Sequence, residues 1–169
     1  MISKTLTYDD VLLAPKYSEI RSRKEIDISN KLDDNITLRL PIIASPMDTV
    51  SGFEMASVLS KLGALSIIHR YATAEGQCRI VSDLKSETGA VVGAAIGTDK
   101  EALMRARCLA KVGVDVICID VAHGHHIAVK EALRALKSDS CFDGIHIMAG
   151  NVATPSAVQA LSDWGADSI

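Results

Sequence analysis

The sequence predicts an α/β protein with a parallel sheet, of the (β/α)8 TIM-barrel type. Three observations lead to this prediction. From residue 41 onward, short apolar runs alternate with segments of helical period, which is typical of parallel strands joined by helices. These runs are almost unbroken, as expected for strands that are covered on both faces. One pattern, a helix end followed by a glycine and a new strand, recurs at even spacing.

The elements follow one another in two parts. Residues 1–40 are expected to form an irregular arm that packs on the barrel and contains one or two short strands, because an apolar stretch closed by Pro15 leads into charged and polar turns. Residues 41–169 carry five βα units. Their strands are expected at Ile42–Ser45, Ala64–Ile68, Ala90–Ile96, Asp115–Val121 and Ile145–Ala149.

The helices between these strands carry start signals and apolar stripes. Ser51–Glu54 and Thr98–Glu101 have the spacing of a capping box, and Thr154 precedes a proline at the first helical position. The stripes expected to face the sheet are Ala102, Ala106, Leu109 and Ala110 on one helix and Val129, Leu133 and Leu136 on the next.

Three helices are predicted to end at glycines, Gly63, Gly113 and Gly165, in the left-handed conformation. These glycines lie 50 and then 52 residues apart, about two βα units each time. Such even spacing favours a barrel over a doubly wound sheet, and the G-x-G-x-x-G turn of dinucleotide-binding sheets is missing. Because a barrel needs about 250 residues, we expect this chain to be the first five-eighths of one within a longer polypeptide.

Composition and charge exclude several classes of function. With 18 basic and 21 acidic residues the net charge is −3, and the basic residues are dispersed, so no nucleic-acid partner is expected. No apolar run approaches the ~18 residues of a membrane helix, and the N-terminus lacks the apolar region of a signal peptide. The four cysteines have neither C-x-x-C nor zinc-site spacing, which indicates reduced thiols in a cytoplasmic protein.

Polar and glycine-bearing loops follow all five predicted strands. In a parallel barrel, the carboxyl ends of the strands form the working face, so these loops are expected to converge on one ligand site. The loops are Ser45–Thr49, His69–Tyr71, Gly97–Asp99, Asp120–His126 and Gly150–Thr154.

Four residues at these ends have both a structural and a functional interpretation. Asp48 either caps the following helix or faces the ligand, and His69 is either a satisfied buried imidazole or a stacking partner. Asp120 ends an apolar strand, where an unpaired carboxylate is costly to bury, so we expect it to bind a ligand hydroxyl or orient a neighbour. Asn151 follows a glycine that allows close backbone approach, which favours a ligand role.

Other reactive residues are expected to be structural. His123, His125 and His126 are too close in sequence for their side chains to converge, so no metal site is expected there. Cys118 lies within a strand and is interpreted as a small core residue. Cys78, Cys108 and Cys141 lie away from the proposed face, and none is expected to act as a nucleophile.

Taken together, several segments resemble the IMP dehydrogenase/GMP reductase family. They occur in family order between about Thr5 and Ile169, and are Tyr8–Pro15, Ser45–Val50, Ile67–Arg70, Asp120–His125 and Ala149–Thr154. The resemblance implies a TIM barrel, usually a homotetramer, that handles a purine 5′-monophosphate such as GMP or IMP beside a nicotinamide cofactor.

The resemblance also implies roles for individual residues. In the family, the Ser-Pro-Met-Asp loop touches the nucleotide, the Asp-x-Ala loop faces the cofactor ribose and nicotinamide, and the Asn of Gly-Asn-Val lies at the reacting purine. The residues that this implies are Ser45, Met47 and Asn151 for the substrate, and Asp120, Val121, Ala122 and His69 for the cofactor.

The family's nucleophilic cysteine attacks purine C2 and lies in a glycine-rich loop beyond the sixth strand, which also helps to hold a potassium ion. That loop is expected after Ile169. The resemblance therefore implies no catalytic residue within this chain, and this part alone is expected to be inactive.

Within the family, GMP reductase is favoured. No regulatory CBS pair stands between His69 and Gly89, and Lys16, Ser22–Asp27 and Gly52–Ala56 resemble GMP reductase. NADPH-dependent deamination of GMP to IMP is therefore expected. The alternative is a CBS-less IMP dehydrogenase that oxidises IMP to XMP with NAD, which Ser45–Met47 and Gly93–Gly97 favour. Another TIM-barrel sugar-phosphate enzyme and a non-catalytic half-barrel are the remaining alternatives.

Overall fold

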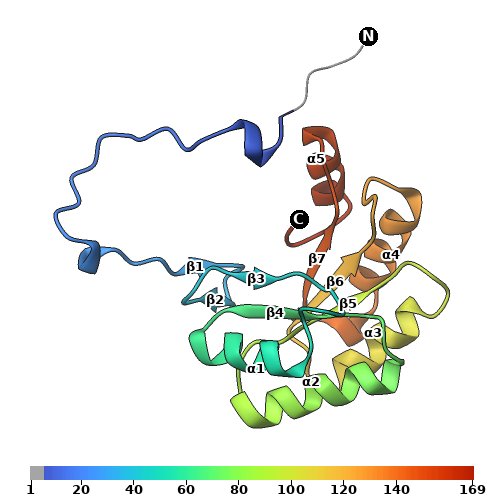
Figure 1. Ribbon diagram of the computed structural model, residues 1–169. Coiled ribbons are helices and arrows are strands. Elements are labelled where there is room, and N and C mark those ends of the chain that lie inside the picture. Colours follow the sequence, from blue (N-terminus) through green and yellow to red (C-terminus); the bar gives the residue numbers. More distant parts are fainter. Residues whose placement is uncertain (1–5) are drawn as a thin grey trace.

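Five parallel strands form a curved sheet in which each strand pairs with the next one along the chain (Figure 1). The computed structural model describes residues 6–169. Because the strand order never reverses, the sheet is part of a (β/α)8 barrel and not a doubly wound sheet. All five expected strands are confirmed: β3 (Ile43–Ala44), β4 (Leu65–Ile68), β5 (Gly93–Ile96), β6 (Val116–Asp120) and β7 (His146–Gly150).

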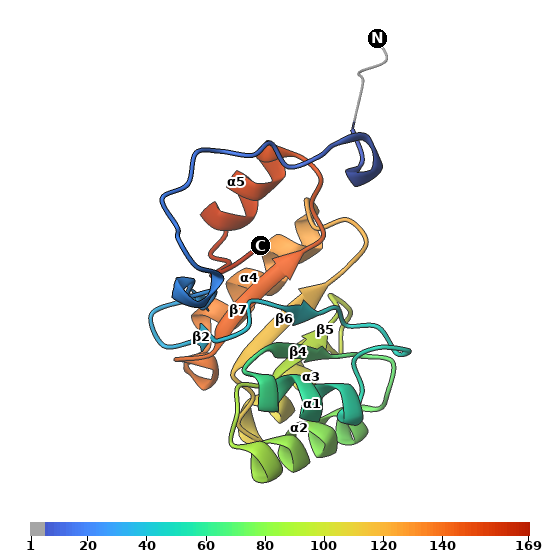
Figure 2. The same ribbon diagram turned by 60° about the vertical axis from the view of Figure 1, so that its left-hand side comes forward.

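Helices follow the strands and cover one face of the sheet (Figures 1 and 2). Among the described residues, none of the helices is long and apolar enough to cross a membrane. The α-helices are α1 (Phe53–Leu62), α2 (Ala74–Thr88), α3 (Ala102–Lys111), α4 (Ile127–Ser138) and α5 (Pro155–Asp163), and short 3-10 turns lie at Tyr8–Asp10, Arg23–Glu25 and Ser140–Phe142.

Two of the three expected helix caps are wrong. The N-cap of α1 is Gly52, and the Ser51 hydroxyl donates instead to the carbonyl of Ser45. The first turn of α3 begins only at Ala102, after a turn in which the Asp99 carboxylate accepts from the Glu101 amide at 2.9 Å. In both places a competing hydrogen bond replaces the expected cap.

The cap of α5 is confirmed. The hydroxyl of Thr154 accepts a hydrogen bond from the Ala157 amide at 3.2 Å, and Pro155 occupies the first turn, where its missing amide costs nothing.

The three repeated helix ends have one hydrogen-bonding pattern. Gly63, Gly113 and Gly165 have φ values of 77°, 81° and 103°, a region that costs other residues a Cβ clash. After each glycine, the next amide donates back to a leucine carbonyl five residues earlier, at 2.9, 3.2 and 3.1 Å. The repeat predicted from the sequence is therefore a repeated Schellman-type end that redirects the chain into a strand.

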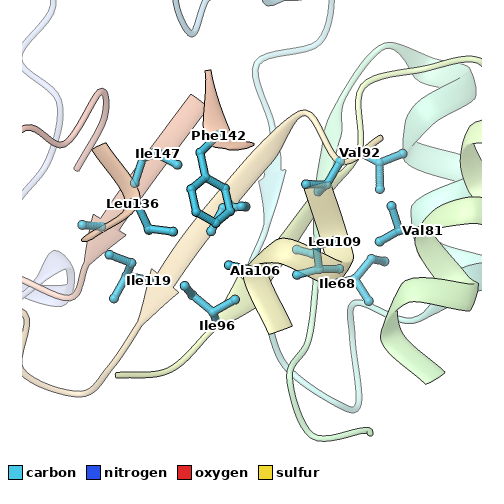
Figure 3. Packing of buried hydrophobic residues seen from close by; sticks show 14 of the residues in the cluster. Ile68, Val81, Val92, Ile96, Ala106, Leu109, Ile119, Leu136, Phe142 and Ile147 are labelled. Carbon is cyan, nitrogen blue, oxygen red and sulfur yellow. The ribbon is translucent and has the colours of Figure 1, made fainter. Parts of the chain in front are cut away.

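The main core lies between the sheet and its helices (Figure 3). The residues of the expected stripes are buried, except that Ala110 is half-buried, and all but Ala102 belong to this core or pack against it. Each fully buried aliphatic side chain contributes about 1.5–3 kcal/mol. Labelled members in Figure 3 include Ile68, Ile96, Leu109, Ile119 and Ile147.

A second, smaller cluster lies on the opposite, concave face. Alternate strand residues such as Leu65, Ile67 and Cys118 point into it, as the two-residue period of a strand requires. Gly93 keeps this interior tight, since a Cβ there would lie 2.4 Å from Ile67 Cδ1. The cluster is completed by Ile36 and Leu38, so the end of the arm fills part of the barrel interior.

The arm contacts the barrel through its last ten residues. Strands β1 (Asn30–Lys31) and β2 (Thr37–Leu38) form a short antiparallel hairpin beside the sheet. Residues 6–21, in contrast, are exposed throughout and belong to a long arch that lies outside the sheet (Figure 1). The hairpin packs on the sheet through Ile36 and Leu38, whereas the apolar side chains of residues 6–21, such as Leu12, are exposed. The expected packing of residues 1–40 as an arm stays a prediction. The division into an arm and a barrel part at residue 40 stays a prediction.

Candidate functional site

Loops from four parts of the chain meet in one pocket at the carboxyl edge of the sheet. Parallel strands bring these ends to the same edge, so residues far apart in sequence become neighbours. The pocket has a volume of about 440 Å³. It is lined by Ser45, Pro46, Met47, Asp48, Tyr71, Asp120 and Asn151.

The pocket continues into a hollow on the concave face of the sheet. This hollow has a volume of about 300 Å³ and shares Ser45, Pro46, Asp120 and Asn151 with the pocket. Its further lining is mostly apolar and includes Ile67, Cys118, Met148 and Val152. The two spaces together offer a polar rim above an apolar floor, an arrangement common in sites for planar organic ligands.

The loop after β3 is fixed by its own backbone. The amides of Val50 and Ser51 donate to the Met47 carbonyl at 3.0 and 2.8 Å, and the Met47 amide donates to Ser45 at 2.8 Å. The buried Ser51 hydroxyl adds a further bond to the Ser45 carbonyl. The Met47 side chain remains 52% exposed and available to a ligand.

The loops after β6 and β7 are joined by three backbone hydrogen bonds. Val121 donates to Gly150 at 3.3 Å, Asn151 donates to Val121 at 2.8 Å, and Gly124 donates to Asn151 at 2.7 Å. A Cβ on Gly124 would lie 2.9 Å from the Asn151 carbonyl oxygen, so only glycine fits this approach. Asn151 is thereby held at a fixed position beside the end of β6.

Asp120 and Cys118 lie on the same side of β6 and differ in their access to solvent. Asp120 is half-buried at the pocket, and its carboxylate accepts no hydrogen bond from any of the residues 6–169. Cys118 is buried two residues earlier, and burial, aided by the negative charge of Asp120, raises its pKa to about 12. The thiol closest to the pocket is therefore protonated at neutral pH and is a poor nucleophile.

Four of the seven expected site residues line the pocket, and three do not. Ser45, Met47, Asp120 and Asn151 come together, as described above. The other three are His69, which is half-buried, Val121, which packs against the main core, and Ala122, which is exposed.

His69 reaches the pocket through its neighbour Tyr71. The His69 Nδ1 accepts from the Tyr71 amide at 3.3 Å, and the two rings are stacked with centroids 6.2 Å apart. Tyr71 itself lines the pocket and was not predicted as a site residue. Its place two residues after His69 in a strand-end loop is the only sequence signal for it.

The histidine-rich loop has structural partners. His126 Nδ1 accepts from the Ala128 amide at 3.1 Å and caps α4, while the His125 ring lies against Trp164 with centroids 5.7 Å apart. Within residues 6–169, no group of three or more His, Cys, Asp or Glu side chains is arranged to hold a metal ion.

Comparison with known proteins identifies the family of the chain. A family model described as IMP dehydrogenase / GMP reductase domain matches residues 5–169. The inosine-5′-monophosphate dehydrogenase of Cryptosporidium parvum is 33% identical over 99% of this chain and 51% of its own length. The GMP reductase of Mycoplasma mycoides is 32% identical over 97% of this chain and 50% of its own length.

A more distant GMP reductase, that of Leishmania major, is 26% identical over 97% of this chain and 60% of its own length. The chain thus spans about half the length of the curated relatives it matches. Both activities occur among relatives of similar identity, so the comparisons do not separate them. The match over nearly all of the 169 residues, on a sheet whose strand ends form one pocket, shows that the chain belongs to the IMP dehydrogenase/GMP reductase family.

Proposed function

We propose that the pocket at the carboxyl edge of the sheet binds a purine 5′-monophosphate beside a nicotinamide cofactor, and that the protein is a GMP reductase. The reaction would be the NADPH-dependent reductive deamination of GMP to IMP, with loss of ammonia. The observation that carries this proposal is the meeting of Met47, Asp120 and Asn151, from three separate strand ends, in one pocket. Family membership supports the same class of substrate.

The pocket has the chemistry that such ligands need. Its apolar floor suits the faces of a purine ring, and Ser45 with the exposed Met47 would contact the nucleotide. Asn151 offers an amide donor and an amide acceptor for the purine edge. The unpaired carboxylate of Asp120 accepts hydrogen bonds only, which suits the hydroxyl groups of a ribose or the amide of a nicotinamide.

When bound, the cofactor supplies the hydride for the reaction. The residues of this chain contribute binding, orientation and exclusion of water. None of its four cysteines is suited to attack the purine, because Cys118 is held protonated and the other three do not line the pocket. The family resemblance implies a nucleophilic cysteine after Ile169, and this stays a prediction.

IMP dehydrogenase is the second candidate. The Cryptosporidium parvum dehydrogenase is 33% identical over 99% of this chain. In the sequence, the strand-end loop Ser45–Met47 favours the same side of the family. The same pocket would then hold IMP beside NAD. The cofactor's phosphate preference, the homotetramer, the potassium ion and the cytoplasmic location stay predictions.

A paired assay on the protein that carries this chain separates the two activities. We expect GMP with NADPH to give a loss of absorbance at the nicotinamide band, and IMP with NAD to give little gain. The opposite result would assign the protein to the dehydrogenases. No reaction and no nucleotide binding in either pair would contradict both.

A further inference from the structure

Gln77 of α2 is buried under the carboxyl ends of β4 and β5. Its side chain is fully inaccessible to solvent. The Nε2 amide donates to the carbonyls of Ile68 and His69, both at 3.1 Å, and to that of Ala95 at 2.8 Å. One side chain thus joins the ends of two neighbouring strands and the start of the loop that follows β4.

Arg105 of α3 completes this arrangement. Its Nη1 donates to Gln77 Oε1 at 2.9 Å, and its Nη2 donates to the carbonyl of Ala72 at 3.0 Å. The orientation of the Gln77 amide follows from its neighbours, since a flipped amide would place its oxygen against three carbonyls. The loop 69–72 is therefore held at its beginning by Gln77 and at its end by Arg105.

The held loop carries a residue of the pocket. Tyr71 lines the pocket together with Met47, Asp120 and Asn151. Its amide bonds to the His69 ring and its own ring stacks on that imidazole, so the two aromatic side chains form one unit within the loop. A shift of the loop would therefore move both rings relative to the pocket.

The loop conformation has a cost of its own. The Nε of Arg70 is buried and has no hydrogen-bond partner within residues 6–169. A buried donor without a partner opposes the conformation that buries it. The bonds from Gln77 and Arg105 to the two ends of the loop offset this cost, because hydrogen bonds in a satisfied buried network stabilise the conformation in which they form.

We propose that Gln77 and Arg105 are positioning residues, which set the His69–Tyr71 loop against the pocket and thereby control the affinity of the pocket for its ligands without touching them. The statement about the ligands rests on the proposed function, whereas the statement about the loop does not. The alternative is that Gln77 and Arg105 only stabilise the sheet and have no effect on the loop. The bond from Arg105 to Ala72 argues against this, since it reaches only the loop.

The first test measures the loop without any ligand, by amide hydrogen exchange on the full protein. Arg105→Met frees the end of the loop and leaves the three Gln77 bonds in place, whereas Gln77→Met removes the bonds at the beginning of the loop and the acceptor of Arg105 Nη1. We expect amides of residues 69–73 to exchange at least about tenfold faster in both variants, relative to amides of β6 in the same variant. The matched control is Leu84→Ala, which leaves a cavity beside the same helix. Leu84 is fully buried in the main core and takes no part in the network.

The second test measures ligand affinity in the same variants. We expect the Kd of the ligand that lies against Tyr71, whether GMP or NADPH, to rise about tenfold in Arg105→Met and less in Arg105→Lys, which keeps one donor. Unchanged Kd values for both ligands, or loop exchange no faster than in Leu84→Ala, would overturn the proposal. If the wild-type protein binds neither ligand, the proposed function fails, and the exchange experiment alone decides the role of the pair. If Gln77→Met does not fold, the two Arg105 variants decide it.

Discussion

At the scale of the residue, two neighbours on β6 show how position along one strand sets chemistry. Cys118 and Asp120 alternate with core residues and both face the concave side. The cysteine lies inside the barrel and its thiol is deprived of water, whereas the aspartate reaches the edge and stays open to the pocket. The same strand thus supplies an inert thiol and an available carboxylate.

Alkylation tests this difference at Cys118. With its pKa raised to about 12 by burial, the Cys118 thiol stays protonated at pH 8, and the thiolate is the form that reacts. We expect iodoacetamide at pH 8 to modify the exposed Cys141 and to leave Cys118 unmodified in the native protein, as read by peptide mass spectrometry. Denatured protein, in which both react, is the control. Equal native rates would show that Cys118 is accessible and ionised.

At the scale of the element, one buried histidine fastens the arm to the barrel. His146 at the start of β7 donates from Nδ1 to the carboxylate of Asp33 at 2.6 Å, and the Ser168 hydroxyl lies 2.8 Å from Nε2. Burial alone would raise the pKa of Asp33, but bonds from His146 and from the amides of Asn35 and Ile36 outweigh it and lower that pKa. The hairpin is therefore held in place by an ionised carboxylate.

This contact predicts a loss of stability in acid. A pKa that is lower in the folded than in the unfolded protein contributes stability above the unfolded value of about 3.9, and that stability disappears as the pH falls through the folded value. We expect Asp33→Asn to lower the free energy of unfolding by about 2 kcal/mol at pH 7, measured in urea, with the difference from wild type shrinking below about pH 4.

Asp10→Asn is the control for the Asp33 experiment. The pKa of Asp10 is also lowered, by hydrogen bonds from Thr7. Unlike Asp33, however, Asp10 lies with Thr7 in the exposed part of the arm. We expect this change to leave the free energy of unfolding as it is. An Asp33 variant with the stability and acid dependence of the Asp10 variant would contradict the role of the His146 contact.

At the scale of the whole molecule, the strands and helix ends could be predicted from the sequence, whereas hydrogen bonds that replace an expected contact could not. Each strand is an apolar run, and three of the helices before strands end at a glycine, so local signals sufficed to place the sheet and its order. The cap expected at Ser51 failed because its hydroxyl donates to the carbonyl of Ser45, and the spacing from Ser51 to Glu54 does not reveal an acceptor that lies earlier in the same loop.

The same limit explains the site. Strand ends located Met47, Asp120 and Asn151, because parallel topology alone brings them together. Tyr71 was not predicted, since which residue of its loop faces the pocket is set by Gln77 and Arg105, from two other elements.

The central claim, that the ends of β3, β6 and β7 form the purine nucleotide pocket, is tested most directly by a crystal structure of the protein with GMP. We expect the base to lie against Met47 and Asn151, with the carboxylate of Asp120 facing the remaining space. A nucleotide bound instead in the groove of about 220 Å³ between α3 and α4, beside Leu103 and Ala128, would contradict it.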